Sequence, residues 1–173
     1  MSILTQQINK ILKDKGLSHR RLAQIIGEHD SSLNSMIRSK RAFPDDVIQK
    51  IAPVLEVSPE TIKGWILADK YPKSILKMAI EVKQEITPES DKLILTVKID
   101  KLLKPQKLSR TGLSKVIGYN QGKLNKMIKG VEPISPLVIS RIAPVLDVSE
   151  EEIISWTVAD RYSLEALRVA IGI

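Results

Sequence analysis

An internal repeat constrains the fold of this chain more than any other feature of its sequence. Sliding the sequence by 91 residues superposes Ile8–Val82 on Ile99–Ile173 without a gap, and 31 of the 75 aligned positions are identical. The identities run through the whole stretch and include the IAPVL segments at 51–55 and 142–146. Because self-similarity at a fixed period marks a duplicated structural unit, the 173-residue chain is predicted to be a tandem duplication.

The junction between the two copies is expected near the segment QEITPESD, residues 84–91. Apolar periodicity fades there, and Thr87, Pro88 and Ser90 supply turn chemistry before LILTVKIDKLL restarts a helix. We therefore expect a first domain at 1–86, a linker at 87–91 and a second domain at 92–173. The apolar content of 43% is enough for a globular core.

The segment LSHRRLAQIIGEHDSSLNSMIRSK, residues 17–40, has the pattern of two short helices joined by a tight turn. Leu22, Ile25 and Ile26 form an apolar stripe on the first helix, and Gly27 follows where the chain has to stop and turn. Apolar residues at 33, 36 and 37 then resume the helical period. The polar positions between them are expected to face outward, where short hydrogen-bonding side chains suit the base edges of a major groove.

This segment resembles the lambda-repressor and Cro-like helix-turn-helix family. Upstream, INKILKDKG is similar to the family's first helix, and downstream PDDVIQKIAPVLEVSPETI is similar to its fourth and fifth helices. The resemblance implies that the helix beginning near Ser31 lies in the major groove and that the first turn of the preceding helix touches phosphate. Two positions depart from the family: Glu28 replaces an apolar residue after the turn glycine, and Pro53 lies inside the fourth helix, where a kink is expected.

Comparison of the two copies separates a shared frame from a variable face. Most shared positions are apolar or capping residues, whereas the residues around the turn and on the second helix differ, although Asn34 is matched by Asn125. If both copies bind DNA, they are expected to read different half-sites, because different side chains offer different donors and acceptors to the bases.

The residues predicted to contact DNA lie in both copies and have two roles. Phosphate contacts are expected from Arg20, Arg110 and neighbouring basic residues, with His19 on the phosphate side and His29 in the turn. Base contacts are expected from Ser31, Ser32, Asn34, Ser35, Asn120, Gln121, Lys123, Asn125 and Lys126. The complete predicted set adds Arg38, Lys40, Arg41, Thr111 and Lys129.

The charge of the chain favours a polyanionic partner, because the formal net charge is +7 and the pI is about 9.6. The local balance is +3 over residues 16–41 and +5 over residues 107–132. We therefore expect the second copy to be the better DNA reader. Glu28 and Asp30 of the first copy are interpreted as caps that favour the helix dipole, rather than as base-reading residues.

The helix start and stop signals, together with the family resemblance, predict an all-α fold of two tandem lambda-repressor-like domains with five to six helices each. Ser18 and Ser109 are expected N-caps, residues 149–152 have capping-box spacing, and Ser58 with Pro59 starts a fifth helix. The sixth helices, SILKMAIEV and LEALRVAIGI, are expected to close the core of each domain. An interface between copies or between chains is the alternative, which leaves open a homodimer or a protein partner through the last helix.

The aromatic residues argue for duplex DNA over single strands or RNA, which are often held by stacking on exposed rings. Trp65 and Trp156 occupy equivalent helical positions and are interpreted as core residues. Tyr71 and Tyr162 are interpreted as packing or capping residues at helix ends.

Enzymatic activity is not expected. The chain has no cysteine, and its two histidines have no counterpart in the second copy. No glycine-rich phosphate loop, nucleophile elbow or His-Glu-x-x-His segment occurs, and the repeated Asp69 and Asp160 are interpreted as structural. We therefore predict no catalytic residue, no metal site and no cofactor.

The expected location is cytoplasmic and nucleoid-associated. No stretch of about 18 apolar residues is present to span a bilayer, and MSILTQQINK lacks the apolar run of a signal peptide. The predicted function is that of a sequence-specific double-stranded DNA-binding protein, a bacterial or phage transcriptional regulator that reads a bipartite site with two non-identical recognition helices. The alternative is a protein-protein adaptor on the same scaffold, with the second domain alone binding DNA or neither doing so.

Overall fold

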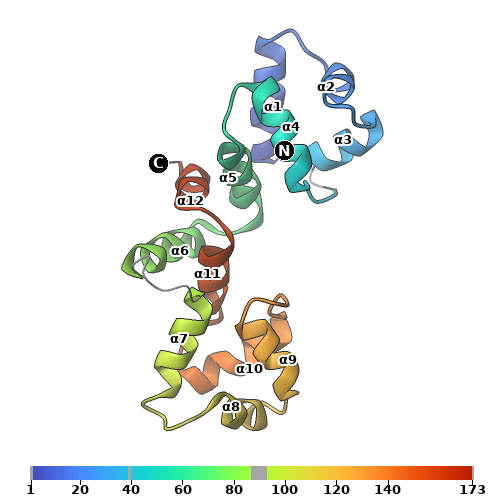
Figure 1. Cartoon of the computed structure of the whole chain (residues 1–173). Coiled ribbons are helices and arrows are strands. Elements are labelled where there is room, and N and C mark those ends of the chain that lie inside the picture. Colours follow the sequence, from blue (N-terminus) through green and yellow to red (C-terminus); the bar gives the residue numbers. More distant parts are fainter. Residues whose placement is uncertain (1, 39, 87–92, 173) are drawn as a thin grey trace. The chain divides into compact units, whose positions relative to one another are not determined.

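The computed structural model describes residues 2–38, 40–86 and 93–172, and the described residues form helices and connections without a strand (Figure 1). Each sequence copy supplies six helices, which confirms the predicted all-α fold. The linker expected at 87–91 lies outside the described residues. The helices are α1 (Ile3–Asp14), α2 (His19–Ile26), α3 (Asp30–Ile37), α4 (Asp45–Leu55), α5 (Pro59–Lys70), α6 (Lys73–Glu85), α7 (Ile94–Leu103), α8 (Arg110–Val116), α9 (Gln121–Ile128), α10 (Pro136–Leu146), α11 (Glu150–Arg161) and α12 (Leu164–Ile171).

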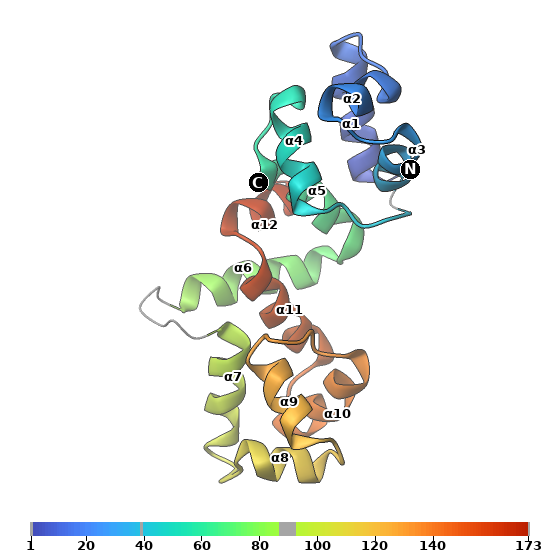
Figure 2. The ribbon, with the colours of Figure 1, turned by 45° about the vertical axis from the view of Figure 1, so that its right-hand side comes forward.

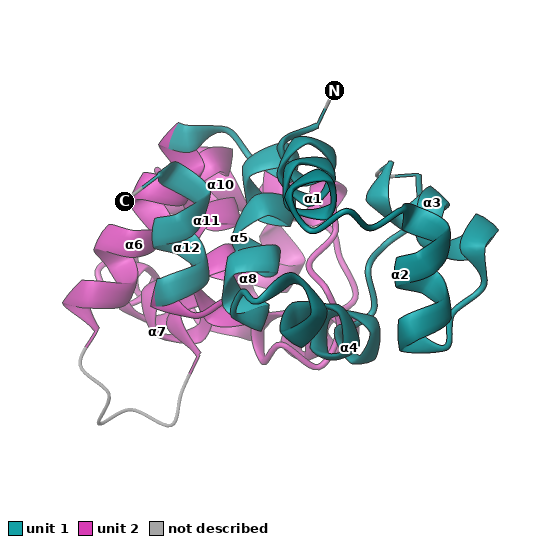
Figure 3. Cartoon of the chain, turned by 90° about the horizontal axis from the view of Figure 1, so that it is seen from above, with its two compact units in different colours: residues 1–73, 165–173 teal, residues 74–164 magenta. Residues whose placement is uncertain are grey.

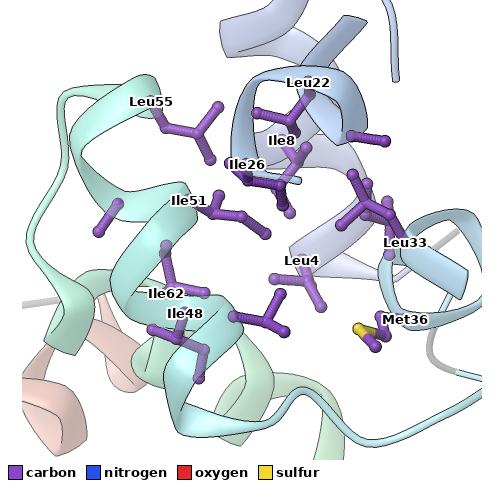
Figure 4. Close-up of a cluster of buried hydrophobic side chains, with 14 of the residues drawn as sticks. Leu4, Ile8, Leu22, Ile26, Leu33, Met36, Ile48, Ile51, Leu55 and Ile62 are labelled. Carbon is purple, nitrogen blue, oxygen red and sulfur yellow. The ribbon is translucent and has the colours of Figure 1, made fainter. Parts of the chain in front are cut away.

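The core of the first copy gathers apolar side chains from α1 to α5 (Figure 4). Ile8, Leu22, Leu33 and Ile51 are fully buried in it, so each of the first four helices contributes at least one side chain that water does not reach. The complete cluster is Leu4, Ile8, Leu12, Leu22, Ala23, Ile26, Leu33, Met36, Ile37, Val47, Ile48, Ile51, Ala52, Leu55 and Ile62.

The apolar stripe predicted on α2 is corrected at one position. Leu22 and Ile26 are buried, but Ile25 is 48% exposed and Ala23 takes its place in the core. Successive helical residues are about 100° apart, so positions 22, 23 and 26 share one face and position 25 falls outside it. The equivalent Val116 of α8 is 60% exposed, so both copies leave this apolar position in water.

The predicted helix starts are confirmed. The hydroxyls of Ser18 and Ser109 accept the amide N–H three residues later, and Ser149 forms a capping box with Glu152. Ser58 caps α5, whose first residue is a proline. Each cap satisfies amides that have no partner inside the helix.

The proline inside the fourth helix lies in its last turn. α4 runs through Pro53 to Leu55, and α10 runs through Pro144 to Leu146. Both helices then end at a residue with left-handed backbone, so the proline ring removes an amide only where the helix is about to finish.

The repeated aspartates of the fifth helices cap the first helix of their own copy. The Asp69 carboxylate accepts the amides of the first two residues of α1 at 2.6 and 3.1 Å, and Asp160 does the same for α7 at 2.6 and 3.0 Å. Burial raises the pKa of Asp160 above its usual value, against the lowering effect of these amides and of Lys83. The repeated Ala-Asp pairs therefore have a structural role.

The repeated aromatic residues lie where they were expected. Trp156 is buried, and Trp65 is half-buried against the core of the first copy. Tyr71 and Tyr162 are the C-terminal caps of α5 and α11, both with extended backbone.

The chain divides into two compact units that do not coincide with the two sequence copies (Figure 3). Unit 1 comprises residues 1–73 and 165–173, and unit 2 comprises residues 74–164. The expected ranges 1–86 and 92–173 therefore describe the repeat rather than the packing. The sixth helix of each copy belongs to the unit built by the other copy: α12 completes unit 1, and α6 completes unit 2.

In unit 1, α12 lies beside α5 (Figure 2), and the two helices approach each other closely at Gly64. A Cβ atom on Gly64 would lie 2.6 Å from Cβ of Val169 and 2.9 Å from the carbonyl oxygen of Ala166, so only glycine allows this approach. The Ser58 hydroxyl also donates to the Glu165 carboxylate at 3.0 Å. Leu167 of α12 is fully buried.

In unit 2, the C-terminal end of α6 is tied to α11 and α7. Lys83 Nζ donates to the carbonyl oxygen of Ala159 at 2.6 Å, and Lys98 pairs with Glu85 at 2.9 Å. Leu76 and Ala79 of α6 are fully buried.

Ending the chain at Ser163 should destabilise the unit that contains the first copy. This truncation removes α12 and its buried Leu167, which we expect to lower the free energy of unfolding of unit 1 by about 3 kcal/mol. Tryptophan fluorescence separates the units, because Trp156→Phe leaves Trp65 to report unit 1 and Trp65→Phe leaves Trp156 to report unit 2. A loss confined to the Trp156 signal would mean that α12 closes its own copy.

Gly64→Ala should destabilise the protein although alanine is the better helix former. The added methyl meets the backbone and Cβ atoms of α12, so we expect a loss of about 1–3 kcal/mol in denaturant unfolding. Gly122→Ala is the matched control, because its methyl would meet only the Asn120 side chain at 3.3 Å. A stabilised Gly64→Ala protein would contradict the close approach.

Candidate nucleic-acid interface

Two pairs of short helices, α2 with α3 and α8 with α9, are joined by turns of the same geometry. Gly27 and Gly118 have positive φ values of 70° and 62°, which glycine adopts without steric cost. The next residues, Glu28 and Tyr119, donate their amides to the carbonyl oxygens of residues 23 and 114, both at 2.9 Å. These bonds close the end of the first helix and redirect the chain into the second, as a helix-turn-helix requires.

In both copies a basic residue of the fourth helix bonds to the turn, although the residue after the turn glycine differs. Glu28 is half-buried and pairs with Lys50 of α4 at 3.0 Å. In the second copy Tyr119 replaces the glutamate, and Arg141 replaces the lysine and donates to the carbonyl oxygens of residues 117 and 118 at 3.2 and 3.4 Å. Glu28, which replaces the apolar residue of the family pattern, is therefore stabilised by an ion pair.

The second helix of each pair buries its apolar face and leaves its polar face accessible. In α3, Leu33, Met36 and Ile37 are buried, as predicted. Ser31 and Arg38 are exposed, whereas Ser32, Asn34 and Ser35 are half-buried. In α9, Gln121, Lys123 and Lys126 are exposed and Asn125 is half-buried.

A chain of hydrogen bonds crosses three helices of the first copy and ends on the polar face of α3. Asn34 Nδ2 donates to Asp30 Oδ1 at 2.7 Å. Because this bond fixes the amide, Asn34 Oδ1 faces His19 Nδ1 at 2.7 Å, and Nδ1 is the donor. The other ring nitrogen of His19 lies 2.7 Å from Oδ1 of Asn9 on α1. His19, which was predicted to touch phosphate, is half-buried and joins α1, α2 and α3.

The remaining predicted residues of the first copy divide into engaged and unengaged side chains. The Ser35 hydroxyl donates to the carbonyl oxygen of Ser31 at 2.9 Å, and Arg41 Nη1 donates to the Ser32 hydroxyl at 3.4 Å. Five exposed members of this predicted set have no side-chain hydrogen-bond or ion-pair partner among the described residues: Arg20, His29, Ser31, Arg38 and Lys40.

The corresponding residues of the second copy are connected differently. Arg110 forms a bidentate pair with Asp100, with distances of 2.8 and 2.7 Å from Nε and Nη2 to the carboxylate oxygens. Gln121 Nε2 donates to the Thr111 hydroxyl at 2.7 Å. Asn120 caps α9 by accepting the amide of residue 123 at 3.0 Å. Arg110, predicted as a phosphate contact, therefore ties α8 to α7, and Gln121, predicted as a base contact, ties α9 to α8.

Three of the remaining side chains of the second copy are without a partner among the described residues. They are Lys123, Asn125 and Lys129, whereas Lys126 lies 3.4 Å from the Glu132 carboxylate. α9 carries two lysines, while α3 carries one aspartate as its single charged residue. The polar face of the second copy is thus the more basic, as the sequence predicted.

Sequence reasoning missed Asn9 and Asp100, which hold the first residue of α2 and α8. The sequence did contain a signal for this contact, because the two residues of the pair change together from the first copy to the second. Asn9 with His19 becomes Asp100 with Arg110, which exchanges an amide–imidazole contact for an ion pair.

Neither a metal site nor a membrane span is found in the described parts. No cluster of three or more histidine, aspartate or glutamate residues at 2–38, 40–86 or 93–172 could hold a metal ion. None of the helices defined above is long and apolar enough to cross a bilayer.

Comparison with known families agrees with this geometry. A helix-turn-helix family model matches residues 8–62, and the model of the Cro/C1-type HTH DNA-binding domain matches residues 98–159. The chain belongs to the lambda-repressor and Cro-like helix-turn-helix family, as a tandem duplication. This family binds double-stranded DNA and is typically not enzymatic. No curated protein and no solved structure matches the chain significantly.

Matched substitutions of the two asparagines should affect stability unequally. Asn34→Ala leaves Asp30 and His19 without their shared partner, so we expect a loss of about 0.5–1.5 kcal/mol in denaturant unfolding. Asn125→Ala removes no side-chain hydrogen bond, so its effect should stay within about 0.5 kcal/mol. Equal losses at both positions would show that the bonds of Asn34 contribute nothing to the fold.

Proposed function

We propose that this chain is a sequence-specific transcriptional regulator of bacterial or phage type that reads a bipartite DNA site. The two helix-turn-helix pairs are called the first head (α2 and α3) and the second head (α8 and α9). The observation that carries the proposal is that both heads have the same turn geometry but place different polar side chains on the second helix. Different donors and acceptors select different bases.

The proposed contacts divide into base-reading and phosphate-binding sets. In the second head, Gln121, Lys123, Asn125 and Lys126 of α9 face the major groove. Asparagine and glutamine pair with adenine through two hydrogen bonds, and lysine reaches guanine acceptors or phosphate. In the first head, the side chains that face the major groove are Ser31, Ser32 and Ser35 of α3. Phosphates are bound by the unpaired basic residues Arg20, Arg38, Lys40, Lys129 and their neighbours.

Joining two heads in one chain raises affinity without a further interface. Once one head is bound, the second contact is intramolecular, and its effective concentration depends on the connection between the heads. Two unlike heads also make the preferred site asymmetric, so the protein has a defined orientation on the DNA.

The adaptor function has one observation in its favour. Val116, Val131 and Leu137 of unit 2 are 60%, 70% and 53% exposed, and such apolar residues are also found at protein interfaces. Binding through an apolar interface would respond weakly to salt, whereas binding to several phosphates weakens steeply with it.

Selection from a random duplex pool, followed by titration at several salt concentrations, tests the proposal. We expect the intact protein to enrich a motif with two unlike halves. Its binding constant should fall with salt with a log-log slope of about −0.9 per phosphate contacted. Substituting Lys40 and Lys129, two residues of the phosphate-binding set, together by alanine should reduce the slope by about 2 units. Lack of any enriched motif, with only weak salt-sensitive binding, would favour the adaptor.

A further inference from the structure

We propose that the two heads divide the work of recognition: Asn125 of the second head reads a base, whereas Asn34 of the first head is withheld from the DNA by Asp30 and His19. This inference rests on the proposed DNA-binding function and concerns which head supplies specificity. The two asparagines are equivalent in the repeat, so the difference between them arises from their surroundings alone.

The withholding of Asn34 follows from the atoms that it uses. A bidentate pair with adenine needs the amide oxygen as acceptor and the amide nitrogen as donor at the same time. In the first head the nitrogen donates to Asp30 and the oxygen accepts from His19, both at 2.7 Å. These bonds engage both amide atoms and fix the plane of the amide, so turning it toward a base would break them and leave a carboxylate without its donor, which reduces the gain from the new pair.

The second head lacks both of these restraints. Arg110, which replaces His19, is held by Asp100 through two of its nitrogens, and Gln121, which replaces Asp30, is held by Thr111. Each group that binds Asn34 in the first head thus has another partner in the second. Asn125 therefore keeps its amide oxygen and nitrogen available for a base.

The charges around the two asparagines favour the same division. Asp30 places a carboxylate at the exposed N-terminal end of α3, where it opposes an approaching phosphate backbone. The equivalent Gln121 is neutral, and Lys123 and Lys126 flank Asn125 along α9. The first head retains the unpaired Arg20, Arg38 and Lys40, which suit phosphate contacts that carry no sequence information. Its half-site is accordingly the less selective one.

The test compares motifs selected by the full-length protein and four variants. Asn125→Ala should erase one strong position of the motif and weaken binding to the selected site about 10- to 100-fold. Asn34→Ala should leave the motif unchanged and alter binding less than about threefold. The third variant, Asn9→Asp/His19→Arg/Asp30→Gln, gives the first head the second head's Asp–Arg pair and its neutral glutamine, and it should release Asn34. It should add a selective position to the weaker half-site, and the same protein carrying Asn34→Ala as well should lose that position.

The outcomes separate this inference from the proposed function. A motif that loses a position equally with Asn34→Ala and Asn125→Ala would overturn the division of work while leaving sequence-specific binding intact. A folded triple variant whose selected motif gains no selective position would overturn the role of Asp30 and His19. If the triple variant does not fold, the comparison of the two single substitutions still decides the inference. Absence of a motif for every protein, including the parent, would be a failure of the proposed function itself.

Discussion

The structure depends on shared burial of apolar helix faces, because no helix in its described parts is long enough to be stable alone. The longest, α6, has 13 residues, and isolated helices of this length are marginal in water. Each helix therefore needs a partner for its apolar side. The first five helices of a copy bury theirs against one another, and the sixth is buried in the unit built by the other copy. Gly64 makes one of these contacts close enough to exclude any larger residue.

The same frame leaves the polar faces of α3 and α9 free to differ. Leu33 and Leu124 are both buried under those faces, and Gly27 and Gly118 give both turns the same backbone. Substitutions on the outer side do not disturb this support, because surface changes away from packed or hydrogen-bonded groups cost little. The contacts between residues 9 and 19 and between residues 100 and 110 show where substitutions are constrained. Each residue of a pair contacts the other, so one substitution requires the second.

The repeat, the helix class, the caps and the turns were all predictable, since each depends on residues close together in sequence. Ser18 precedes its helix directly, and Gly27 follows the last buried residue of α2. Ile25 was assigned to the core because its type fits an apolar stripe, whereas burial depends on the direction of the neighbouring helices. The bonds of Asn34 to His19 and the exchange of the sixth helices join residues far apart in the chain. Periodicity carries no information about such partners.

Fusion of the two copies in one chain is what permits unlike heads. In a symmetric homodimer every substitution occurs in both subunits, so a change that withholds an asparagine in one head withholds it in the other. Here His19 and Arg110 occupy equivalent positions in one polypeptide and have separate partners. Because α6 belongs to unit 2 and α12 to unit 1, neither copy contains a complete unit by itself. The two heads can therefore diverge in the residues proposed to face DNA, while the fold still requires both copies to remain together.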